Sequence, residues 1–273
     1  MFSQLALVCC LAKAQTVLVH VNVFDGTRML RNQTVVLEGG VVKELGGKVP
    51  RPAGAEVIEG KGKTLLPALI DAATMQSAGW IQLVYDDGFA WGKRNPAASF
   101  VELHEEVERV HKEQKRALVE VGSLRESMEA LNAEADGLLR IFAGAQSDPA
   151  FVKLAAKRKV FVIPLLAVLE GAAVQAGKPR REGSLAALRQ LHVAHVPLLA
   201  GGPDLPAELE LLVRDAGLTP VEALQAATSG PARVFGLAER GVIVKGQRAK
   251  LWLVDGDPTA SPTVLKRAGT RVF

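Results

Sequence analysis

The sequence predicts an α/β fold that combines a parallel, barrel-type sheet with a small antiparallel sheet. Strands alternate with helical stretches through residues 65–237, which is the pattern of βα units around a parallel sheet. Before this region, short valine-rich runs follow one another without a helix between them. The chain has 273 residues, of which 48% are hydrophobic and 23% are charged, so it can bury a large core.

The N-terminal part of the chain is predicted to form the antiparallel sheet. Valines alternate with other residues from Thr16 to Val23, which is the period of a strand, and Asp25-Gly26 closes a turn. Three more short β-rich runs follow, at Gln33–Leu37, Val41–Leu45 and Glu56–Glu59.

The middle of the chain is predicted to contain six parallel strands. One holds Asp71, and the others are Gly79–Asp87, Ala117–Val121, Gly137–Phe142, Val160–Leu165 and Pro197–Ala200. The predicted helices are Phe100–Lys115, Ser123–Asn132, Asp148–Arg158, Ser184–Val193, Ala207–Ala216 and Thr219–Thr228. A closed (β/α)₈ barrel needs eight strands, so we expect a barrel that is open, distorted or completed by another chain.

The first residues have the pattern of a secretory signal peptide. The apolar run Leu5–Ala12 is followed by a small-x-small site, which predicts a signal over residues 1–15 with cleavage near Ala14 or Gln15. This favours a secreted or periplasmic protein. The alternative is a buried N-terminal strand in a cytoplasmic protein, and the run is too short to span a bilayer.

Charge and composition limit the classes of partner. The formal net charge is +4 and the pI is about 9.1, but basic residues are interspersed with acids, as in Glu105–Arg116. Nucleic-acid binding normally needs a basic stripe or patch, so we expect no nucleic-acid partner. A small-molecule substrate or ligand is the partner that this composition leaves open.

Several motifs resemble those of one enzyme family. They are T-L-L-P-A-L-I-D-A-A-T-M at Thr64–Met75, S-D-P-A-F-V-x-L-A-A at Ser147–Ala156, G-L-T-P-x-E-A-L-x-A-A-T at Gly217–Thr228 and G-V-I-V-K-G-Q-R-A-K-L-W-L-V-D-G-D at Gly241–Asp257. Together they resemble the metal-dependent amidohydrolases, most closely the imidazolonepropionase-like group. The last motif departs from the family at Lys250, where aspartate is usual.

The resemblance implies a fold and an activity. The fold is a TIM-like (β/α) barrel with a small β-sandwich made from both chain ends, here residues 16–64 and 238–273. Strands two and three of the family barrel have no counterpart between Met75 and Gly79, so the barrel is expected to be incomplete or distorted. The family activity is metal-dependent hydrolysis of non-peptide C–N bonds, in cyclic amides or related amides and esters, with zinc or another divalent metal.

The same resemblance implies that the metal ligands have been replaced. The family's two first-strand histidines, its carboxylated lysine, its two later histidines and its aspartate correspond in turn to Ala73, Met75, Gln82, Glu120, Arg140 and Pro203. A methyl group or a thioether does not hold a hydrolytic metal against water, and a guanidinium stays protonated. The sequence therefore predicts a protein with no metal cofactor and no catalytic activity.

Two alternatives remain open at this stage. One is an active hydrolase with a relocated or metal-free site that uses Asp71, Glu120, Arg140 and Asp204. A shifted alignment places Asp204 with Glu120 around Arg140, which is more typical of an ion pair than of a metal centre. The other alternative is a non-catalytic binding or self-associating protein, since strand edges left by the missing strands would favour a homo-oligomer.

Other polar residues are weaker candidates. Asp86 and Asp87 follow a predicted strand, where barrel enzymes carry their chemistry, but a structural turn before Gly88 explains them better. His104 and His111 are seven residues apart on a helix, which is not the spacing of a zinc protease. His192 and His195 could share one helix face, and we expect no metal there because a strand begins at once.

Overall fold

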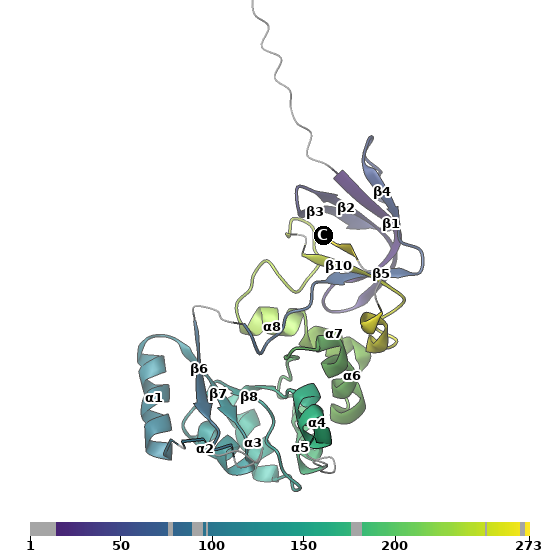
Figure 1. Ribbon diagram of the computed structural model, residues 1–273. Helices are drawn as coiled ribbons and strands as arrows, with labels where there is room; N and C mark the ends of the chain where they lie inside the picture. Colours follow the sequence, from purple (N-terminus) through teal and green to yellow (C-terminus); the bar gives the residue numbers. More distant parts are fainter. Residues whose placement is uncertain are drawn as a thin grey trace, which may run out of the picture.

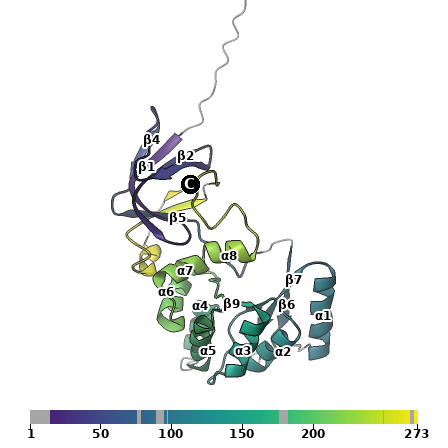
Figure 2. The ribbon, with the colours of Figure 1, turned by 180° about the vertical axis from the view of Figure 1, so that it is seen from behind.

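The computed structural model describes residues 15–75, 79–88, 95–96, 98–175, 182–248, 250–267 and 271–273. It contains two sheets, one antiparallel for the most part and one parallel, which lie at opposite ends of the molecule with α7 (Pro220–Ala226) and α8 (Ser229–Val234) between them (Figures 1 and 2). No helix in the described part of the chain is both long enough and apolar enough to cross a membrane. The predicted fold class is confirmed.

The first sheet has seven strands and is built from both ends of the chain. Its central path runs β11-β10-β5-β1-β2-β3, and β4 pairs with β1. β10 lies antiparallel to β5, with Leu253 opposite Leu65. Apolar side chains of both chain ends therefore share one buried core. The strands are β1 (Gln15–Phe24), β2 (Met29–Glu38), β3 (Val41–Gly46), β4 (Glu56–Glu59), β5 (Lys63–Pro67), β10 (Leu251–Asp255) and β11 (Arg271–Val272).

β1 changes its partner half-way along its length, and this bends the sheet. Residues 16–19 pair with β4, whereas residues 22–23 pair with β5. Between these two parts lies His20, whose φ of 53° is in the left-handed region and marks an irregularity in the ladder. Gly60 packs against Val21 so closely that a Cβ would lie 2.6 Å from the valine Cβ. The bend lets one strand serve both halves of the sheet.

The second sheet is parallel and has the order β6-β7-β8-β9. Two further segments extend it: Leu198 bridges to Val162, and the Ala72 amide donates to the Ala200 carbonyl at 3.0 Å. The six predicted strand positions are therefore adjacent, but in the described residues the barrel does not close. The four strands are β6 (Trp80–Tyr85), β7 (Arg116–Val121), β8 (Gly137–Leu139) and β9 (Phe161–Ile163).

Three strand predictions need correction. The predicted barrel strand that holds Asp71 does not form, because β5 ends at Pro67 in the other sheet. The Ala72 amide donates to Ala200 beside the parallel sheet, whereas the Ile70 amide donates to Ala227 after α7. β8 is shorter than predicted because Arg140 has a φ of 77°. β9 ends before Pro164 and the left-handed Leu165.

Helices cover the outer face of the parallel sheet and bury the largest apolar core. Capping boxes begin three of them, at Ser99 with Glu102, Ser123 with Glu126, and Thr219 with Glu222. Two helices, α4 and α8, were not predicted. The remaining helices are α1 (Phe100–Lys112), α2 (Leu124–Asn132), α3 (Pro149–Arg158), α4 (Leu166–Gln175), α5 (Glu182–Val193), α6 (Leu205–Ala216) and a 3₁₀ turn, Pro262–Lys266.

The inner face of the parallel sheet is apolar over most of its area. Leu118, Leu139, Phe161 and Ile163 project from three neighbouring strands into one buried cluster, joined by Phe235 from the segment after α8. Side chains in this cluster occupy the space that would be the interior of a closed barrel. Polar side chains lie at both ends of this apolar face, with Arg116 at the amino end of β7 and Glu120 near its carboxyl end.

Candidate functional site

The candidate site lies at the carboxyl ends of β6, β7 and β8, which is where parallel barrels place their chemistry. The side chain at its centre is Arg140, the first residue after β8. Its left-handed backbone turns the chain sharply, although its amide still donates to the Ile163 carbonyl at 2.8 Å. The guanidinium is therefore held by a rigid, hydrogen-bonded strand end.

Two carboxylates flank this guanidinium. Nη1 of Arg140 donates to Oδ2 of Asp86 at 2.7 Å, and Nη2 donates to Oε1 of Glu120. The exposed fractions are 17% for Arg140, 5% for Asp86 and 19% for Glu120. Gln82 completes the group, since its amide nitrogen donates to Oε2 of Glu120 at 3.1 Å. Arg140, Asp86 and Glu120 form a largely buried charged cluster, the Arg140 triad, and Gln82 contacts it from β6.

The sequence anticipated one partner of Arg140 and missed the other. The expectation that Asp204 faces Arg140 is wrong, because Asp204 is the N-cap of α6 and its Oδ1 accepts from the Ala207 amide at 3.0 Å. Asp86 takes that place instead. Its second oxygen, Oδ1, accepts from the Gly88 amide at 2.8 Å, so the predicted turn is present as well.

Asp71 holds two segments of the chain together. Its Oδ1 accepts from the amides of Ala73 at 2.9 Å and Gly202 at 2.8 Å, and its Oδ2 accepts from Thr74 Oγ1 at 3.0 Å. The carboxylate thus ties the segment after β5 to the loop after residue 200. Because both oxygens already accept hydrogen bonds, Asp71 is placed as a structural clamp rather than as a free base.

The positions of the first two family histidines face apolar neighbours. Ala73 and Met75 pack against the inner apolar cluster. Gly201 lies so close to this segment that a Cβ there would be 2.9 Å from the Ala73 Cβ. Pro203, at the family's aspartate position, lines a separate cavity of about 430 Å³ with Asp71 and Trp252. The side chains of Ala73, Met75 and Pro203 offer no ligand for a hard metal ion.

One group of acids elsewhere has the spacing of a metal site. Oxygens of Asp86, Asp87 and Glu126 lie within 4.8 Å of one another. However, Glu126 accepts from the amides of Asp87, Gly122 and Ser123, and it closes the capping box of α2. Arg125 contacts Asp87 and Glu126, and Arg140 contacts Asp86. Hydrogen bonds and two guanidinium groups already satisfy these oxygens, so the group does not fit a cation.

Sequence reasoning missed Glu208, a fully buried acid on α6. Its oxygens accept from the amides of Leu166 at 2.9 Å and Ala167 at 2.8 Å, which are the first residues of α4. Burial raises the pKa of Glu208 to about 7, the nearby charge of Asp71 adds to this rise, and the backbone hydrogen bonds oppose it. No signal in the sequence separates this residue from an ordinary solvated helix acid.

The histidines that the sequence singled out are engaged in pairs. His111 lies 2.8 Å from Asp136, and His104 lies 3.6 Å from Glu108 on its own helix. His192 pairs with Glu222 at 3.3 Å. His195 lines the same 730 Å³ cavity as His192, but among the described residues no third ligand joins them in a metal-binding group.

A comparison with known protein families finds a match to part of the chain. The sequence profile described as the amidohydrolase family matches residues 198–272, which include α6, α7, α8 and β10. This part of the chain is similar to the amidohydrolase family. The resemblance seen in the motifs is therefore confirmed. No curated protein matches the chain.

Solved structures share the fold over nearly the whole chain. An ochratoxinase from A. niger superposes with a TM-score of 0.77 at 14% identity, covering 96% of this chain and 94% of that one. A Bifidobacterium longum protein described as a prolidase gives 0.74 at 17% identity, with 93% and 92% covered. A Xaa-Pro dipeptidase gives 0.74 at 12% identity, with 92% and 96% covered. At identities this low, the superpositions show a shared fold alone.

Proposed function

We propose that this chain is an amidohydrolase-family protein that has lost metal-dependent hydrolysis and acts without a metal. One observation carries the proposal: at the carboxyl ends of β7 and β8, where the family resemblance places two metal-binding histidines, the Arg140 guanidinium sits between Asp86 and Glu120. A fixed positive charge repels a divalent cation, and it uses the carboxylate oxygens that could have bound one.

The remaining positions support the same conclusion. Ala73 and Met75 contribute to an apolar cluster, and the Gln82 amide cannot form the carbamate that bridges metals in the family. Metal-dependent hydrolysis relies on a bound ion that lowers the pKa of water, so the loss of several ligands at once removes the nucleophile. The residues present therefore do not fit zinc or a related ion.

Metal analysis combined with activity assays tests this proposal. We expect the purified chain, after incubation with zinc, manganese and iron and then dialysis, to retain far less than one metal per chain by elemental analysis. It should not hydrolyse amide, lactam or ester substrates, whereas a metal-loaded amidohydrolase assayed in parallel should. Stoichiometric metal with turnover that a chelator abolishes would overturn the proposal. Turnover that resists the chelator would instead favour the metal-free hydrolase.

A specific observation also favours self-association. In the described residues β6 pairs only with β7, so its other edge has no strand beside it. Val84 on this strand is 64% exposed, and Gln82 is exposed as well. Unpaired edges with exposed apolar side chains are templates for pairing with another chain. We propose that two copies of the chain associate through β6.

The association is tested by light scattering on size-separated protein at several concentrations. We expect a concentration-dependent dimer, and we expect Val84→Lys to weaken it about tenfold because a charge would be placed against the partner edge. Val193→Lys is the matched control, since Val193 is 78% exposed and lies at the end of α5. A monomer at every concentration, or equal effects of both variants, would contradict pairing through β6.

Residues 1–14 lie outside the described residues, so the signal peptide stays a prediction. We propose a secreted or periplasmic protein on the basis of the apolar run Leu5–Ala12. N-terminal sequencing of protein recovered from the secreted fraction should start near Gln15. Recovery of the uncut chain from the cytoplasm would favour the buried-strand alternative.

A further inference from the structure

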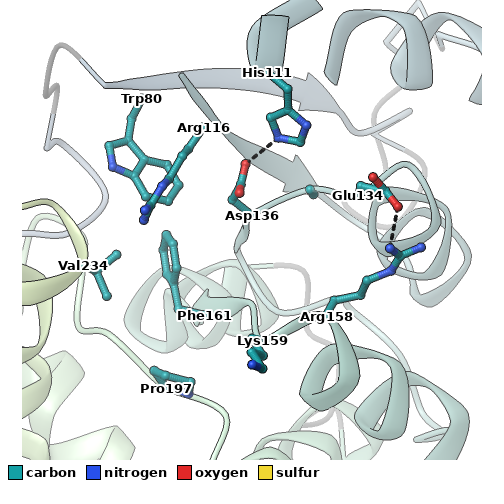
Figure 3. A pocket seen from close by; sticks show the side chains of 11 residues that line it. Trp80, His111, Arg116, Glu134, Asp136, Arg158, Lys159, Phe161, Pro197 and Val234 are labelled. Atoms are coloured by element: carbon teal, nitrogen blue, oxygen red, sulfur yellow. Dashed lines mark hydrogen bonds and ion pairs between the residues drawn. The ribbon is translucent and has the colours of Figure 1, made fainter. Parts of the chain in front are cut away.

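A cavity of about 480 Å³ opens at the amino ends of the parallel strands, away from the Arg140 triad. Residues at the start of three strands line it: Trp80 on β6, Arg116 on β7 and Phe161 on β9. Lys159, between α3 and β9, lies on another side (Figure 3). Its volume is within the range of small-molecule sites, and neither the motifs nor the proposed function account for it.

One wall of this cavity is aromatic and fixed in position. The Trp80 ring meets Phe161 edge-on, with 5.3 Å between centroids, and Phe235 packs against both rings. Phe161 can lie across β8 because Gly137 has no side chain, and a Cβ there would be 2.5 Å from the phenyl ring. Phe161 is only 4% exposed. These edge-on contacts hold the Trp80 and Phe161 rings in place without a ligand.

The other walls carry an excess of positive charge. Two carboxylates line the cavity, and each is already paired: Asp136 with His111 at 2.8 Å and Glu134 with Arg158 at 2.6 Å (Figure 3). Asp136 also accepts from the Ala117 amide at 2.7 Å. The three permanent cations of the lining, Arg116, Arg158 and Lys159, therefore outnumber its two acids by one.

Two of these cations are available to a ligand. Arg116 lies over the Trp80 ring, 5.5 Å from its centroid, which orients the guanidinium beside the aromatic wall. Among the described residues, no carboxylate lies within ion-pair distance of Arg116 or of Lys159. A guanidinium on an aromatic face recognises a planar carboxylate through paired hydrogen bonds.

We propose that this cavity binds a small aromatic carboxylate carrying one negative charge. The ring would pack on Trp80 and Phe161, and the carboxylate would pair with Arg116 and Lys159, which would neutralise the excess charge of the lining. This inference rests on the cavity itself and is independent of the loss of metal-dependent hydrolysis, so each can fail without the other.

Calorimetric titration of the full chain with 1-naphthoate tests the proposal. We expect saturable binding of one naphthoate per chain, and binding of the uncharged 1-naphthamide about tenfold weaker or more, because the amide keeps the ring and loses the charge. Naphthoate affinity should also fall with added salt. Absence of saturable naphthoate binding, or equal affinity for the two compounds, would overturn the proposal.

Variants locate the site. Arg116→Gln and Lys159→Gln should each weaken naphthoate binding, Arg116→Gln by about tenfold, and Arg116→Lys should restore part of that loss because it restores the charge without the planar fork. Lys245→Gln is the matched control, since Lys245 pairs with Glu44 on the seven-stranded sheet and its side chain is 67% exposed. Far-ultraviolet circular dichroism confirms that each variant is folded. Unchanged affinity in Lys159→Gln and in folded Arg116→Gln would place binding elsewhere and overturn the proposal.

Discussion

Replacing Arg140 with methionine should lower the free energy of unfolding by about 3–5 kcal/mol. Methionine keeps much of the volume but removes the cation between Asp86, which is 5% exposed, and Glu120, which is 19% exposed. Two like charges would then remain in a poorly solvated site without a counter-ion. Chemical denaturation monitored by circular dichroism measures the change.

Matched variants separate the charge effect from a packing effect. Arg28→Met removes an arginine whose side chain is 77% exposed, and it should change stability by less than about 1 kcal/mol. Adding Asp86→Asn and Glu120→Gln to Arg140→Met should recover part of the loss, because the buried charges are then gone. If Arg140→Met is as stable as the unchanged protein, the triad is not an obligatory ion cluster.

Stability should also fall as the pH rises from about 4.5 to about 7, because of Glu208. Burial raises the pKa of Glu208 to about 7 in the folded chain from its ordinary value of 4.5. Between these values the unfolded chain has released the proton and the folded chain retains it, so folding becomes less favourable as pH increases. The full effect is about 3 kcal/mol, reached near pH 7 and constant above it.

The effect of Glu208 is isolated by subtracting the pH profile of a variant that cannot titrate at this position. The unfolding free energy of the unchanged protein minus that of Glu208→Gln should decrease across this pH window. Glu44→Gln, the same substitution at an exposed residue, is the matched control. A difference profile that is flat between pH 4.5 and 7, or one that rises, would mean that the two amides of α4 hold Glu208 ionised at low pH.

Much of the fold could be predicted because its signals are local. Alternation of valines identified β1, short β-rich runs identified β2 and β3, and the C-terminal motif identified the strand that completes the first sheet. Strand ends were less predictable, because Arg140 and Leu165 adopt left-handed backbone conformations that are uncommon for these residue types. α4 was missed because its mostly apolar run has no polar face to give it helical periodicity.

The sequence predicted that Glu120 and Arg140 lie in the candidate site, but it did not predict which second carboxylate pairs with Arg140. Glu120 lies near the end of β7 and Arg140 follows the adjacent parallel strand β8, so their proximity follows from topology. Asp86 and Asp204 both lie in loops, and which of them meets Arg140 depends on loop geometry that a single sequence does not contain. The burial of Glu208 could not be predicted for a related reason, because it results from the packing of α4 against α6.

The joining of β5 to β10 has a consequence for the way in which the molecule is assembled. Thr64 donates to the Gly256 carbonyl across 192 residues, so the edge of β5 stays uncovered until nearly the entire polypeptide has been synthesised. Loop-closure entropy opposes such distant contacts, whereas the βα units between them pair with their neighbours. The βα units of the parallel sheet are thus expected to fold first during synthesis. The seven-stranded sheet is expected to form last, when β10 pairs with β5.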